Sequence, residues 1–146
     1  MASDSALGSE MTLAIFKLNG QMLGAGEAIA RPAGVTVAWW QVLGAVLREP
    51  LTVAEIGRRM GITRQAVQRI ANRLIDEGML ESRPNPAHKR SPLFTPTARG
   101  RAAIERIAPD QTAFSTRIIE AFGRDELEHL ISELHRLSTV VEETRP

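Results

Sequence analysis

The run from Thr63 to Arg73 concentrates side chains that can bond to nucleic acid. Arginine can grip the two acceptors of guanine, and glutamine can pair with adenine. Apolar residues recur here at helical spacing, and they are Val67, Ile70 and Ala71 within the run and Leu74 directly after it. A helix here therefore presents its polar residues on the opposite side, namely Arg64, Gln65, Gln68, Arg69, Asn72 and Arg73. This face is the predicted DNA surface.

The predicted surface divides by the chemistry of its side chains. In a helix-turn-helix protein the N-terminal part of the second helix enters the major groove deepest, which favours Arg64, Gln65 and Gln68 for base edges. Thr63, Arg69 and Arg73 are better suited to phosphates, and such contacts position a protein without reading sequence. If this helix is considered by itself, the alternative interpretation is that its charged and polar residues form an ordinary solvent-exposed face with no binding role.

Local signals around this run predict the elements that position it. Thr52 and Glu55 form a capping box at the start of a helix that begins at Val53. Gly61 supplies a tight turn, and Thr63 caps a second helix that runs from Arg64 to Glu77. Gly78 then ends that helix. Two helices joined by a short turn result.

A hairpin with a basic tip follows the second helix. Strands are predicted over Met79–Arg83 and Pro92–Thr95, and Pro92 implies an edge position. The tip holds His88, Lys89 and Arg90, which are candidate DNA contacts, and we expect Lys89 and Arg90 to reach the minor groove or its phosphates. Thr97 can cap the next helix. The whole arrangement predicts a winged helix.

The charge distribution supports this interpretation independently. Between Gly57 and Arg101 there are ten Lys or Arg residues and three acidic residues, so this window carries +7. The whole chain carries only +1, which leaves −6 for the remainder. A basic patch of this kind neutralises phosphates and releases their counterions.

These motifs, taken in series, resemble the MarR family of winged-helix transcription regulators. The resemblance is carried by Leu51–Gly57, Thr63–Val67, Leu74–Glu81, His88–Arg90 and Thr97–Gly100. It implies a mainly α fold with a small β-hairpin, in which a winged helix-turn-helix core is flanked by N- and C-terminal dimerisation helices. His88 and Lys89 depart from the family's usual acid followed by arginines, so a wing-stabilising carboxylate is expected to be missing. Pro96 replaces the usual apolar residue before Thr97.

The resemblance also implies how the chain is organised. We expect a single MarR-like domain over 1–146, with the winged-helix DNA-binding lobe at 35–96 and dimerisation helices at 10–31 and 97–146. The helix over Glu10–Ala30 has a broad apolar stripe that three glycines interrupt. Either these glycines allow another helix to approach closely, or the helix frays near Gly24 and Gly26. Arg124–Glu143 carries a leucine-rich seam for another helix. A purely intramolecular core is the alternative to a dimer.

Two further helices are predicted between these elements. Thr36 can cap a helix to about Arg48 that supports the DNA-binding unit. Another runs from Thr97 to about Phe122 and is expected to bend at Pro109, which has no backbone N–H. The chain is thus predicted to form six helices and one hairpin.

A ligand site is the second implication of the resemblance. Such regulators often bind a small aromatic ligand between the dimerising helices and the winged helix. Trp39 or Trp40, with Met22 or Arg48, is the candidate set here. Because Trp39 and Trp40 are adjacent, we expect only one to point fully inward. Simple core packing is the alternative role for both.

Composition limits the other functional classes. The chain has 146 residues, which suits one domain, and no cysteine, which excludes disulfides and thiolate chemistry. His129 and His135 lack the i, i+4 spacing that aligns metal ligands on a helix, so we expect no metal site. No grouping of serine, histidine and a carboxylate stands out, so we expect neither enzyme activity nor a cofactor. Neither a signal peptide nor a membrane span is indicated, and a cytoplasmic location is expected.

The sequence predicts a homodimeric, sequence-specific DNA-binding regulator. Its expected target is a pseudo-palindromic operator in double-stranded DNA, its expected role is that of a repressor, and a small ligand is expected to release it. The alternative is a winged-helix module whose basic face binds an acidic protein partner.

Overall fold

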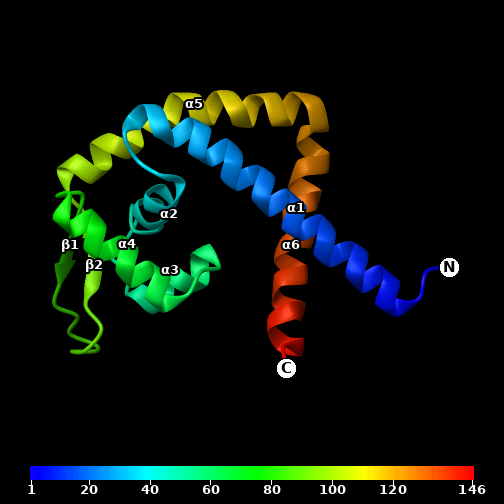
Figure 1. Ribbon diagram of the computed structural model, residues 1–146, viewed down its shortest axis with the longest axis horizontal. Helices are drawn as coiled ribbons and strands as arrows, with labels where there is room; N and C mark the ends of the chain where they lie inside the picture. The colour runs from blue at the N-terminus through cyan, green and yellow to red at the C-terminus, as the bar shows by residue number, and fades with distance from the viewer. The chain divides into compact units, whose positions relative to one another are not determined.

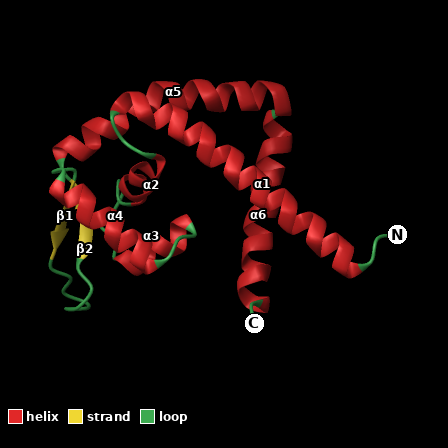
Figure 2. Ribbon diagram, viewed as in Figure 1, coloured by secondary structure: helices red, strands yellow, loops and turns green.

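The computed structural model describes residues 1–146 and is mainly helical with one β-hairpin (Figure 2), as predicted. Its elements in chain order are α1 (Asp4–Ala30), the 3-10 helix η1 (Arg31–Ala33), α2 (Val37–Ala45), α3 (Val53–Met60), α4 (Arg64–Asp76), β1 (Leu80–Arg83), β2 (Leu93–Pro96), α5 (Ala98–Phe122) and α6 (Arg124–Thr144). The chain forms two compact units, Met1–Ala108 and Pro109–Pro146. No helix is both long enough and apolar enough to cross a membrane.

Helix α3, the turn and α4 form as predicted from their caps. The Thr52 hydroxyl accepts a hydrogen bond from the Glu55 N–H, and the Thr63 hydroxyl accepts one from the Ala66 N–H. The Glu55 carboxylate makes no hydrogen bond back to Thr52, so the predicted capping box is only half formed. Gly61 ends α3 in the left-handed conformation with φ of 68°.

The core of the first unit lies beneath these helices. Its largest fully buried side chains are Phe94, Leu43, Ile56, Leu74, Leu80, Ile107, Val42, Val46 and Val67. The apolar face predicted for α4 is confirmed, because Val67, Ala71 and Leu74 are buried and Ile70 packs against the core. Each element of the winged helix contributes to this core, so the exposed face of α4 rests on a packed support.

The hairpin pairs β1 with β2 in antiparallel register, from Leu80 opposite Pro96 to Arg83 opposite Leu93. Leu51 joins the other side of β2 through two backbone hydrogen bonds with Phe94, at 2.8 and 3.2 Å. The edge position predicted from Pro92 is confirmed for the two-stranded sheet, except at Phe94, whose other side is bridged by Leu51. Pro92 lies just outside the strand, so its missing N–H places no restriction there.

Helix α1 is longer and more regular than its glycines suggested. It starts at Asp4, where Ser3 caps it, and continues without interruption to Ala30. Fraying near Gly24 and Gly26 was the wrong prediction. A Cβ atom on Gly26 would lie 2.7 Å from the Val37 side chain, so this glycine lets α1 and α2 approach closely. Helix α2 ends at Ala45, three residues before the predicted Arg48.

Within the first unit, α1 is packed at only one end. Figure 1 shows α2, α3 and α4 gathered beside the hairpin, whereas the N-terminal half of α1 extends away from them. The first buried residue of α1 is Gly26, and Ala30 is the other. The preceding turns therefore expose most of their apolar side chains.

The second unit begins inside α5, which stays helical through Pro109. A bend at that proline stays a prediction. Gly123 separates α5 from α6 with φ of 103°, a conformation that favours glycine. No residue of α6 is buried. On its surface, a hydrogen bond donated by Arg136 lowers the pKa of the Glu133 carboxyl.

Candidate nucleic-acid interface

The polar face of α4 is fully presented to solvent. Arg64, Gln65, Gln68, Arg69, Asn72 and Arg73 are all exposed, as is Thr63 at the N-cap. The Thr63 oxygen already accepts the Ala66 N–H, but its O–H can still donate to a phosphate. One helix thus presents both kinds of side chain expected of a DNA surface.

Two amides on this face are joined. The Gln68 Nε2 donates to the Asn72 Oδ1 at 2.8 Å, across one turn of α4. This bond leaves the Gln68 Oε1 free to accept and the Asn72 Nδ2 free to donate. An adenine presents the complementary donor and acceptor in the major groove. Sequence reasoning assigned these residues separately and did not foresee their contact.

Most cations of the basic window have no carboxylate partner. Arg59, Arg73 and Arg83 form ion pairs with Glu49, Glu77 and Glu81, respectively. The other seven form none, and they are Arg58, Arg64, Arg69, Lys89, Arg90, Arg99 and Arg101. Unpaired, exposed cations keep their charge available for phosphates. Of the two arginines on α4 that are predicted to contact phosphates, Arg73 is held by an ion pair and Arg69 is not.

The wing carries its three predicted contact residues at an exposed tip. His88, Lys89 and Arg90 are all exposed, and they lie in the loop between β1 and β2. Asn85 organises this loop: its Nδ2 donates to the Ser91 carbonyl at 2.9 Å, and its Oδ1 accepts from the Ala87 N–H at 3.2 Å. Sequence reasoning missed Asn85, although Asn-Pro is a turn signal whose side chain often bonds two residues ahead.

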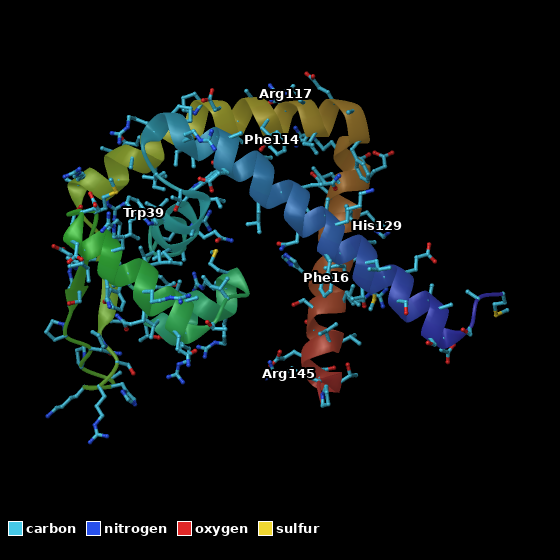
Figure 3. The ribbon with its side chains drawn as sticks, in the orientation of Figure 1. Phe16, Trp39, Phe114, Arg117, His129 and Arg145 are labelled. Carbon is cyan, nitrogen blue, oxygen red and sulfur yellow. The ribbon has the colours of Figure 1, made fainter.

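The predicted ligand residues differ in their surroundings. Trp39 and Trp40 are both half-buried on α2 and pack against the core, so neither points fully inward (Figure 3 labels Trp39). Trp40 approaches Gly26 of α1. Met22 lies one helical turn before Gly26 and is exposed, and Arg48 is exposed in the loop after α2. The structure thus brings Trp40 to the junction of α1 and α2.

Comparison with known proteins identifies the family. The profile of the MarR family matches residues 33–91, which span α2 to the wing. An uncharacterized protein of Mycobacterium tuberculosis is 36% identical over 132 residues, which are 90% of this chain and 92% of that protein. The chain belongs to the MarR family. Its winged helix-turn-helix is therefore a DNA-binding unit, and its family and fold are those of transcription regulators.

Solved MarR structures share the fold along nearly the whole chain. A crystal structure of a MarR family transcription regulator is 26% identical, has a TM-score of 0.75, and is matched over 96% of this chain and 93% of its own. A mutant MarR of Escherichia coli in complex with operator DNA is 21% identical, with a TM-score of 0.75 and coverage of 93% and 99%.

Proposed function

We propose that this MarR family protein is a homodimeric repressor that binds a pseudo-palindromic operator. The observation that carries the proposal is the exposed polar face of α4, where Arg64 and Arg69 have no carboxylate partner and the joined amides of Gln68 and Asn72 keep one acceptor and one donor group free. Arg64, Gln65 and Gln68 read base edges in the major groove. Thr63, Arg69 and Arg73 contact phosphates, and the wing residues His88, Lys89 and Arg90 add contacts beside them.

Dimerisation is supported by apolar side chains that the single chain leaves exposed. On α1, Leu13 and Phe16 are each 68% exposed. On α6, Ile131, Leu134 and Val141 are exposed and no residue is buried. Large exposed apolar stripes of this kind mark association surfaces. A dimer also places two recognition helices on half-sites about 34 to 36 Å apart, which a specific operator needs.

This assignment extends to the organisation of the chain. Residues 35–96 form the DNA-binding lobe of one MarR-like domain, and 10–31 and 97–146 supply its dimerisation helices. Repression follows if the operator overlaps a promoter, since a bound dimer then excludes polymerase. A reporter gene behind the chain's own promoter tests this role. Higher expression after deletion of the regulator supports repression, and lower expression indicates activation.

DNA binding is tested with duplexes selected from a random pool. The selected duplex and a scrambled duplex of equal composition are titrated with protein at several salt concentrations, and fluorescence anisotropy measures Kd. We expect the selected duplex to bind at least about 10³-fold more tightly, with affinity falling steeply as salt rises. Equal affinity for both duplexes contradicts a specific regulator. Tight binding to an acidic protein with no duplex preference supports the interaction-module alternative.

Release by a small aromatic ligand is the remaining part of the proposal. The residues assigned to it are the half-buried Trp39 and Trp40 on α2, the exposed Met22 on α1 and the exposed Arg48 after α2. The chain has two Trp and no Tyr, so its intrinsic fluorescence reports on α2 alone. Titration with salicylate is expected to change this emission and to weaken operator binding. An unchanged emission together with unchanged affinity contradicts a site for this ligand class.

A further inference from the structure

The wing tip is tied together by the side chain of Asn85. The Nδ2 group reaches across the loop to the Ser91 carbonyl at 2.9 Å, while the Oδ1 atom accepts the Ala87 N–H at 3.2 Å. Two backbone bonds add to this, from the His88 N–H to the Asn85 carbonyl and from the Ser91 N–H to the His88 carbonyl. Asn85 is half-buried, although the residues on either side of it are exposed. One amide therefore joins the two arms of the wing.

The neutrality of this amide matters for the cations that it positions. A carboxylate in the wing would accept hydrogen bonds from the loop, but it would also partly neutralise nearby cations. Lys89 and Arg90 form no ion pair, and the nearest pair of the hairpin, Arg83 with Glu81, lies on β1. The wing thus gains order from Asn85 without losing positive charge at its tip.

We propose that Asn85 is a positioning residue for DNA binding, which holds the wing closed so that Lys89 and Arg90 reach the DNA backbone in a preformed arrangement. A preordered loop loses less conformational freedom on binding, and affinity rises accordingly. The inference rests on the proposed function, because it needs the wing to contact DNA. Under this proposal, the uncharged Asn85 contributes to DNA affinity through the loop that it orders.

Two substitutions separate the bonds of Asn85. Asn85→Ala removes both, whereas Asn85→Asp keeps the acceptor for Ala87, loses the donor to Ser91 and adds a negative charge near the tip. Ser82→Ala on β1 is the control, because Ser82 is exposed in the same hairpin and has no assigned contact with DNA. We expect Asn85→Ala to raise Kd for the selected duplex about tenfold. Asn85→Asp should raise Kd at least as much, and Ser82→Ala should leave Kd unchanged.

Hydrogen exchange distinguishes positioning from general destabilisation. Asn85→Ala should speed exchange of the Ala87 amide while leaving amides of α4 and the melting temperature unchanged. Asn85→Asp should preserve protection of Ala87. Exchange that quickens throughout the first unit would show that Asn85 supports the fold as a whole and would overturn the positioning role.

A double-mutant cycle supplies the decisive comparison. Because Asn85 acts through the tip, Asn85→Ala should cost little further affinity in a Lys89→Ala/Arg90→Ala background. The same loss in both backgrounds overturns the inference, as does an Asn85→Ala protein that binds like wild type. Wild-type protein without any duplex preference instead refutes the proposed function, so the two failures are distinguishable.

Discussion

At the scale of single residues, the hydrogen bond between Gln68 and Asn72 affects how α4 can read DNA. Side chains that are joined before binding lose less freedom when they meet a base. A shared bond also means that removing either partner disturbs the other. The two amides therefore form one joined pair in the unbound protein, and the proposed base contacts of α4 would involve both.

We predict that Gln68→Ala and Asn72→Ala relax base preference at the same position of each half-site. Each substitution should reduce discrimination at that position by about 1 to 3 kcal/mol, the value of a good bidentate contact. Selection of bound duplexes, repeated with each variant, measures the effect. Loss of preference at two different positions would mean that the side chains read bases independently.

A second residue-scale prediction concerns phosphate contacts. Arg69 has no carboxylate partner, whereas Arg73 pairs with Glu77 at 3.3 Å. Arg69→Ala should weaken all duplexes alike and reduce the salt slope by about one for each phosphate that is no longer neutralised. Arg73→Ala should do the same to a smaller extent, because its guanidinium must first leave Glu77. Anisotropy titrations against salt measure both slopes. A sequence-dependent loss in Arg69→Ala would show instead that Arg69 reads bases.

At the scale of elements, the turn between α3 and α4 depends on a glycine whose role no local pattern indicates. A Cβ atom on Gly57 would lie 2.8 Å from the Ile62 carbonyl oxygen, which belongs to the backbone of that turn. The Gly57 carbonyl also accepts the Gly61 N–H that ends α3. The position of α4 relative to α3 therefore requires the absence of a side chain at residue 57.

We predict that Gly57→Ala destabilises the protein by about 1 to 3 kcal/mol, because the backbone must shift to admit the methyl group. Gly44→Ala in α2 is the matched control, since nothing lies within 4 Å of its added Cβ. That substitution should be neutral or stabilising by up to about 1 kcal/mol. Urea unfolding measures both. Equal stability of Gly57→Ala and wild type would contradict the close approach.

At the scale of the whole molecule, charge and apolar surface occupy different parts of the chain. The window from Gly57 to Arg101 carries +7 and includes α4 and the wing, while the remainder carries −6. The exposed apolar side chains lie mainly on α1, α5 and α6. This separation allows one surface to attract a polyanion while others bury apolar area in a dimer.

We predict that Phe16→Glu converts the dimer to a monomer at micromolar concentration. Burying a phenylalanine contributes roughly 1.5 to 3 kcal/mol, and a dimer buries two copies. Operator affinity should fall together with dimerisation, and analytical ultracentrifugation with anisotropy measures both. Lys17→Ala, at the adjacent exposed position, changes the net charge by the same −1 and is the control. A Phe16→Glu protein that remains dimeric would place the interface elsewhere.

The sequence by itself determined the helix-turn-helix and the order of the elements. Thr52, Gly61, Thr63 and Gly78 act on backbone groups within a few residues, and helical periodicity selects the buried face of α4, so local physics suffices for these features. The same holds for α6, whose predicted range of Arg124–Glu143 differs from the structure by one residue.

Only the tertiary structure decided the contacts between residues separated along the chain. Gly26 against Val37, Leu51 beside Phe94 and Asn85 bonded to Ser91 each depend on the approach of two backbone segments. No local pattern specifies such an approach, since it follows from packing of the whole core. For that reason the sequence predicted the exposed polar face of α4, whereas the structure revealed which neighbours hold the wing and α4 in place.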